Sequence, residues 1–167
     1  MAGTVPNERA AVVRRVRALL KEGFVQLPKG ISSEPGEPMA VGDSDGHIHS
    51  WMVPFVADGR LIAWAQIGRA LEFLRFSLLA GGRIGASPDA ADWLDVERIS
   101  ARIAEAAGID RLLSPPVLTY DRDPSRLVWA AEVKTADEKR QRWFAAGVNV
   151  WRDRGVEEIT GGPVVSK

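Results

Sequence analysis

Two stretches of the chain, Pro38-MAVGDSDGHIHS-Trp51 and Pro116-VLTYDRDPSRLV-Trp129, share one pattern that decides the fold. In each, an Asp-x-Asp begins five residues after the proline, and a tryptophan stands thirteen residues after it. The two stretches are offset by 78 residues. Similarity at a fixed offset is typical of a duplicated structural unit. The sequence therefore predicts that the chain contains the same unit twice.

The pattern continues beyond both stretches. Trp64 stands four residues before Gly68, and Trp143 stands four residues before Gly147, so the offset here is 79 residues. One single-residue insertion reconciles the two offsets. We therefore expect the tryptophans to occupy matching positions in the two units.

Each unit begins with a helix. Asn7 is a good N-cap for a helix over about Glu8–Glu22, whose apolar residues recur at helical spacing and which ends at Gly23. In the second half, Ser87 is followed by a proline suited to the first helical position, and helical periodicity continues to Gly108. Both helices are amphipathic, and we expect each to cover a sheet.

Strands follow the first helix, at about Met39–Val41 and His47–Val56. The tetrapeptide ADGR at 57–60 predicts a hairpin, because a type I′ turn needs positive φ at both central residues. Pairing that starts at this turn places Val53 opposite Trp64. One face of the hairpin would then hold Trp51, Val53, Phe55, Ile62 and Trp64.

Residues 69–79 fit either a strand or a helix, and we favour a fourth strand because the matching stretch after Gly147 is rich in β-formers. The prediction is an α+β fold of two tandem units, residues 1–85 and 86–167. Each unit consists of one helix followed by an antiparallel meander of three or four strands. The two units are expected to pack as one compact domain.

Composition narrows the class of protein. Twenty-two basic residues balance twenty-two acidic ones, whereas nucleic-acid binders usually carry a basic excess, so we expect no nucleic-acid partner. The chain has no cysteine, which excludes disulfides, thiolate nucleophiles and cysteine-based metal centres. The first residues lack an apolar signal region, and charges interrupt every long apolar stretch. We therefore expect a cytoplasmic protein without membrane association.

The order of helix and three strands, with a tryptophan early in the second strand and a glycine after the third, resembles the PepSY family of small α+β modules. The second unit carries the resemblance in LVWAAEV at 127–133 and RWFAAGV at 142–148. Ala145 and Ala146 stand where that family usually has an aspartate-containing turn. The resemblance implies a non-catalytic module that binds or restrains partner proteins, often peptidases. Members of the family are typically exported or membrane-attached, and no export signal is visible here.

The densest polar cluster is Asp43, Asp45, His47 and His49, with Trp51 next to it. Strand alternation puts the two histidines on one face about 7 Å apart, a spacing that can serve one metal ion, and the two carboxylates could complete its ligand shell. The second stretch keeps the aspartates but has Ser125 and Leu127 in place of the histidines. Aspartates at turns are also explained by hydrogen bonds to backbone amides.

Catalytic groups are few. A Ser-His-Asp arrangement would have to use His47 or His49, and the chain has no G-x-S-x-G sequence. The glycine-rich stretch 81–85 lacks the lysine and the spacing of a phosphate-binding loop. We therefore assign no catalytic residue, no metal site and no cofactor, and favour a protein that is not an enzyme.

The resulting hypothesis is a non-catalytic binding or regulatory module that engages a protein or peptide partner through its sheet faces or the groove between its units. Edge strands also allow a homodimer. The alternative is a small-molecule-binding protein or enzyme with a pocket near His47 and His49, metal-dependent or not. In either case we expect Asp43, Asp45, His47, His49 and Trp51 to contribute to binding.

Overall fold

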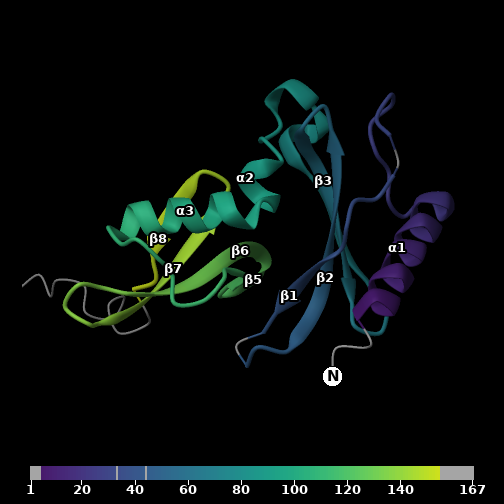
Figure 1. Cartoon of the computed structure of the whole chain (residues 1–167). Helices are drawn as coiled ribbons and strands as arrows, with labels where there is room; N and C mark the ends of the chain where they lie inside the picture. The colour runs from purple at the N-terminus through teal and green to yellow at the C-terminus, as the bar shows by residue number, and fades with distance from the viewer. Residues whose placement is uncertain (1–4, 33, 44, 155–167) are drawn as a thin grey trace, which may run out of the picture.

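The strands of the chain form one mixed sheet, shown in Figure 1. The computed structural model describes residues 5–32, 34–43 and 45–154. Its strands are β1 Met39–Gly42, β2 Ile48–Ala57, β3 Arg60–Gly68, β4 Phe73–Leu78, β5 Val117–Asp121, β6 Asp123–Lys134, β7 Arg140–Ala146 and β8 Asn149–Arg152. The order across the sheet is β4-β3-β2-β1-β5-β6-β7-β8. All neighbours are antiparallel except β1 and β5, which run parallel where Val41 pairs with Leu118.

Three α-helices accompany the sheet in the described part of the chain: α1 Val5–Glu22, α2 Ala91–Leu94 and α3 Val96–Ala107. Two short 3-10 helices, η1 Leu79–Gly82 and η2 Ile84–Ala86, lead from β4 towards α2. In Figure 1, α1 lies against the β2–β3 part of the sheet, and α3 lies over the β6–β8 part. The predicted α+β class and compact packing are confirmed, whereas the division at residue 85 stays a prediction because one sheet runs through both halves.

The two long helices cover opposite faces of the sheet. Trp51 packs in a buried cluster with Val12 and Val16 of α1. Its neighbour Met52 packs instead in the cluster that contains Ile99 of α3. Adjacent strand residues point to opposite faces, so α1 and α3 lie on different sides. The cluster around Met52 draws buried residues from both halves of the chain and joins them into one core.

The predicted hairpin is confirmed, but the predicted register beyond it is wrong. Asp58 and Gly59 both have positive φ, at 52° and 71°, and Ala57 pairs with Arg60. A β-bulge then inserts Ile62 as an extra residue between the pairs that flank it. Val53 therefore pairs with Ala65 rather than Trp64, and Trp64 moves to the face opposite Trp51.

The helix predicted to run without a break to Gly108 is interrupted. Asp95 adopts an extended conformation, and its side chain accepts hydrogen bonds from the backbone N–H of Glu97 and Arg98. It thus ends α2 and caps α3, because a short acidic side chain at this position satisfies donors that a helix start leaves free. Gly108, at a φ of 68°, ends α3 as predicted.

The predicted helix start at Ser87 is wrong, because the Ser87 hydroxyl donates a hydrogen bond to the Arg83 carbonyl and α2 begins only at Ala91. Two further element predictions agree with the structure. The ambiguous segment forms a strand, β4, and the first helix ends at Glu22 before Gly23, although it already begins at Val5. Within the part of the chain that the structure describes, no helix combines the length and the apolar character needed to span a bilayer.

Candidate functional site

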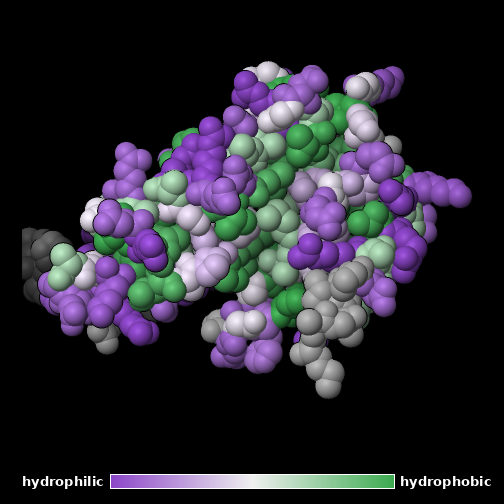
Figure 2. All heavy atoms as spheres, in the orientation of Figure 1, coloured by the Kyte–Doolittle hydropathy of each residue, from purple (hydrophilic) through white to green (hydrophobic). Residues whose placement is uncertain are grey.

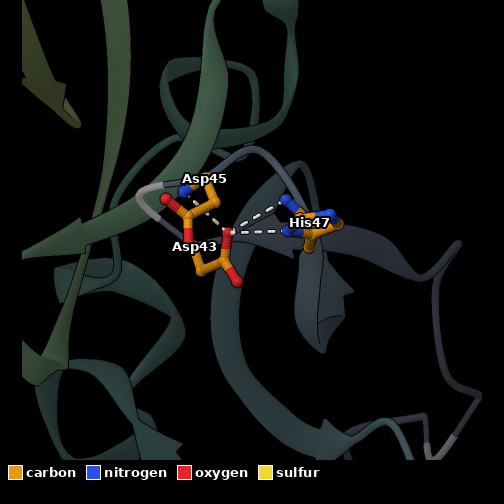
Figure 3. A group of neighbouring side chains, drawn as sticks. All are labelled: Asp43, Asp45 and His47. Carbon is orange, nitrogen blue, oxygen red and sulfur yellow. Dashed lines mark hydrogen bonds and ion pairs between the residues drawn. The ribbon is translucent and has the colours of Figure 1, made fainter.

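The turn between β1 and β2 holds the polar cluster that the sequence singles out, and Figure 3 shows three of its side chains. Asp43 Oδ1 accepts hydrogen bonds from the backbone N–H of Asp45 and of His47, each at 2.9 Å. The His47 Nδ1 atom lies 3.9 Å from the same oxygen. The Asp43 carboxylate thus folds the turn around itself, as short acidic side chains commonly do.

These hydrogen bonds also lower the pKa of Asp43 below its ordinary value of 3.8, with the bond from the His47 backbone as the largest cause. Donors that bond to a charged carboxylate favour its ionised form. One ligand atom each from Asp43, Asp45 and His47 lies within 4.8 Å of the others, a distance that would suit a metal ion. All three residues are exposed or nearly so, however, and the hydrogen bonds of the turn already account for their proximity.

A pH-dependent effect of Asp43 on stability follows from this geometry. Because the pKa of Asp43 is depressed in the folded chain, its ionised form stabilises the fold at pH values above 3.8, and this contribution disappears as the pH falls through the folded-state pKa. We expect Asp43→Ala to be less stable than the unchanged protein at pH 7, with a difference that shrinks below pH 3.8. Urea unfolding across this pH range measures it, and Asp45→Ala is the control because, among the described residues of the turn, no hydrogen bond ends on the Asp45 carboxylate. A difference that is independent of pH would contradict the role of the charge.

His49 does not join this turn and instead belongs to a second polar group. A β-bulge between Val41 and Gly42 leaves His49 as an extra residue of β2. Its Nδ1 atom lies 2.7 Å from the hydroxyl oxygen of Tyr120 on β5, and the two rings meet edge to face. Bulges re-aim side chains in this way. The two histidines, expected side by side, therefore have different partners.

The second polar group continues from Tyr120 into the interior. The Tyr120 hydroxyl lies 2.9 Å from Ser50 Oγ, and Nε2 of Gln66 lies 3.0 Å from Ser50 Oγ and 2.5 Å from the Tyr120 hydroxyl. Ser50 and Gln66 are fully buried. We call Gln66, Ser50, Tyr120 and His49 the tyrosine network. It connects β3 and β2 of the first half with β5 of the second.

Three members of this network were not predicted from the sequence. The predicted register, with Val53 opposite Trp64, would place Gln66 opposite Trp51, but the bulge at Ile62 moves Gln66 opposite Met52, on the face where Tyr120 lies. Ser50 precedes a tryptophan in a strand and carries no distinguishing signal. Tyr120 is the only tyrosine of the chain, and this was the one available hint.

Trp51, the last predicted binding residue, lies under α1. Its side chain is 3% exposed and packs among apolar residues, and the Arg9 guanidinium lies 5.9 Å from the centre of its ring. It contacts neither the turn nor the tyrosine network in any interaction that the structure shows. Its position is that of a core anchor, which is the usual role of a large aromatic side chain in a sheet.

Hollows between the described residues lie away from these polar groups. One of about 590 Å³ lies between the two halves of the sheet and is lined by Arg9, Gly36, Glu37, Pro38, Met39, Ala40, Pro54, Val56, Leu94 and Trp129. We call it the interhalf groove. A second, of about 660 Å³, lies beside Phe144 and Trp151, and a third, of about 530 Å³, lies beside α3. Figure 2 shows hydrophobic residues gathered along the furrow between the two parts of the molecule.

The comparisons with known proteins give no match. No protein-family model, curated protein or solved structure matches this chain.

Proposed function

We propose that this chain is a non-catalytic, cytoplasmic binding module of two PepSY-like helix-and-meander units, and that a peptide segment of a partner protein binds in its interhalf groove. The main support for this proposal is that residues of both halves line the groove. Its lining combines residues from the first half, such as Pro54 and Val56, with Leu94 and Trp129 from the second. A site that lies between two units needs residues of both. The duplicated architecture would therefore be required for binding.

Strand pairing supports the duplicated architecture. Trp51 pairs with Ala40 and Ile67, and Trp129 pairs with Leu118 and Ala145. Each residue of the second trio stands 78 positions after its counterpart. A helix covers each tryptophan-bearing face, α1 in the first half and α3 in the second. Because β1 and β5 run parallel, the two halves are related by a rotation about an axis along the strands. This rotation exchanges the two faces of the sheet.

The strand register does not support the predicted match between Trp64 and Trp143. Trp143 pairs with Ala131, which stands 78 positions after Val53. Val53 pairs with Ala65, so Trp143 corresponds to Ala65 and not to Trp64. The offset of 78 therefore holds through this part of the sheet, without the insertion that the sequence pattern required before Trp143.

The chemistry of the groove favours a peptide. The groove is lined mostly by apolar residues and is open to solvent, since its lining residue Val56 is exposed. Arg9 and Glu37 add one ion pair, with 3.5 Å between Nη1 and Oε1. The Nε atom of Arg9 is buried, and no described residue accepts its hydrogen bond. A peptide carbonyl would supply that acceptor while apolar side chains fill the groove, whose volume lies within the range of about 300–1,000 Å³ usual for ligand sites.

If a peptide binds in the groove, one substitution in its lining should strongly weaken the affinity. We expect Val56→Asp to weaken peptide binding at least tenfold, about 1.4 kcal/mol, because it places a charge against an apolar ligand surface. Val56 is 40% exposed, so the fold tolerates the change. Peptides selected from a random library on the unchanged protein serve as ligands, and fluorescence anisotropy gives Kd.

Val148→Asp is the matched control, since Val148 is 65% exposed and does not line the groove. It should leave Kd unchanged. Selected peptides that bind both variants equally well would place the binding surface elsewhere. A library that yields no peptide above background would contradict the proposed function itself.

A second copy of the chain can also act as partner. The strands β4 and β8 form the two edges of the sheet, and backbone groups on an edge can pair with another strand. We therefore propose homodimer formation through an edge as a secondary mode of association. Sedimentation of the purified protein over a concentration series tests it, and a monomer at every concentration would exclude it.

A further inference from the structure

Two buried side-chain atoms on neighbouring strands are left without hydrogen-bond partners in the part of the chain that the structure describes. One is Nε of Arg75 on β4, and the other is the terminal oxygen, Oε1, of Gln66 on β3. The two residues pair directly across the strands. Directly opposed residues of antiparallel strands share a face, with Cβ atoms about 4.5–5.5 Å apart. An unpaired buried polar group is costly, so two at adjacent positions indicate a site.

The distances around Gln66 determine which atoms are unpaired. The amide atom facing Tyr120 lies 2.5 Å from the hydroxyl oxygen. N–H···O bonds usually span about 2.7–3.2 Å and O–H···O bonds about 2.5–3.0 Å, so this distance fits an oxygen facing the hydroxyl. A half turn of the amide exchanges its oxygen and nitrogen, and the hydrogen-bond network decides between the two orientations. With the oxygen inward, it accepts from Tyr120 and Ser50.

The inward oxygen leaves the Gln66 nitrogen as the unpaired atom. The site then presents two buried N–H donors, one from Gln66 and one from Arg75. Arg75 also forms no ion pair with a carboxylate of the described residues. A positive charge without a counter-ion among the described residues, next to two unpaired donors, fits an anion that accepts hydrogen bonds.

We propose that Arg75 and Gln66 bind a carboxylate group. The planar guanidinium fork matches the two oxygens of a carboxylate and can donate Nε–H and Nη–H side by side. Gln66 donates the third hydrogen bond, and the tyrosine network holds its amide in the required orientation. Arg75 is only partly buried and lies on the edge strand β4, so a ligand can approach it from solvent. The site is separate from the interhalf groove, whose lining includes neither residue.

Titration with sodium acetate tests the site directly, at pH 7 and at an ionic strength held constant with sodium chloride. Proton–nitrogen NMR spectra report the Arg75 Nε–H and the Gln66 side-chain amide. We expect saturable shifts of both signals with a common Kd on the order of 1 mM, since acetate has few atoms. Shifts that stay linear and equal those caused by chloride alone would overturn the proposal.

Substitutions of Arg75 distinguish the contribution of the guanidinium fork from that of its positive charge. Arg75→Gln should weaken acetate binding at least tenfold, and Arg75→Lys, which keeps the charge but not the fork, should weaken it by less. Arg69→Gln removes the same charge from an exposed loop position and should leave Kd unchanged. Equal affinity in Arg75→Lys and the unchanged protein would remove the fork from the proposal, and equal affinity in Arg75→Gln would refute it. Should Arg75→Gln not fold, the lysine variant and the signals of the unchanged protein still decide.

A second pair of ligands tests whether the carboxylate belongs to a peptide C-terminus or to a small molecule. Triglycine with a free C-terminus should compete with acetate, whereas triglycine amide should not. Tighter binding of the free peptide than of acetate assigns the site to peptide C-termini, and equal binding assigns it to small carboxylates. Competition by the amide would contradict carboxylate recognition. Val56→Asp should leave all of these affinities unchanged, so failure of this site and failure of the groove are separate results.

Discussion

Replacing Trp129 with alanine is expected to lower the free energy of unfolding by about 3–5 kcal/mol, a large part of the total for a domain of this kind. The side chain is 4% exposed and packs in the core that both halves share. Its indole Nε1 donates a hydrogen bond to the carbonyl oxygen of Trp93 at 2.8 Å. The substitution therefore creates a cavity and also removes a partly buried hydrogen bond to the Trp93 carbonyl.

Denaturant unfolding followed by circular dichroism and by tryptophan fluorescence measures this loss. Because the shared core includes Met52 from the first half and Ile99 from the second, we expect one coincident transition for both signals. Phe24→Ala is the control, since Phe24 is 64% exposed, and it should change stability by no more than about 0.5 kcal/mol. Two separate transitions would mean that the halves fold independently.

The second large effect is expected at the contact between α1 and the sheet. Val16 is fully buried against the face that contains Trp51 and Phe55. We expect Val16→Asp to cost roughly 4–6 kcal/mol, because it loses apolar burial and places a carboxylate among buried apolar side chains. A loss of this size leaves the chain mostly unfolded at 25 °C if its stability is near the low end of the usual range.

The matched control for Val16→Asp is Ala10→Asp, which adds the same charge at an exposed position of the same helix. It should change the free energy of unfolding by no more than about 0.5 kcal/mol. Thermal unfolding of both variants compares them. Equal stability of the two variants would show that α1 contributes little to the fold and that the sheet face beneath it is stable without a cover.

Local structure was largely predictable from the sequence because it depends on neighbouring residues. The Asp58–Gly59 turn needed positive φ at both positions, and few other residue pairs adopt that conformation readily. Glycine after Glu22 and after Ala107 marked the ends of two helices for the same reason. The break at Asp95 was missed because aspartate is tolerated within a helix start as well as at a cap, and only the local backbone distinguishes them.

The candidate sites were predictable only in part. The turn around Asp43 lies within five consecutive residues, so its hydrogen bonds follow from sequence alone. The tyrosine network joins residues 70 positions apart, such as Ser50 and Tyr120. The pair of Arg75 and Gln66 depends on the register of β3 with β4 and on the bulge at Ile62, and neither feature has a signature in the chain.

The α+β class and the main turns could be predicted from the amino-acid sequence alone, since backbone preference and apolar spacing act over short distances. The strand registers, the parallel contact of β1 with β5 and the placement of α1 and α3 on opposite faces depend on contacts between residues far apart in the chain. A single bulge reverses the face of every residue beyond it, and its position follows from how whole strands pack together. Long-range packing therefore placed Gln66 beside Tyr120, where no local pattern could have put it.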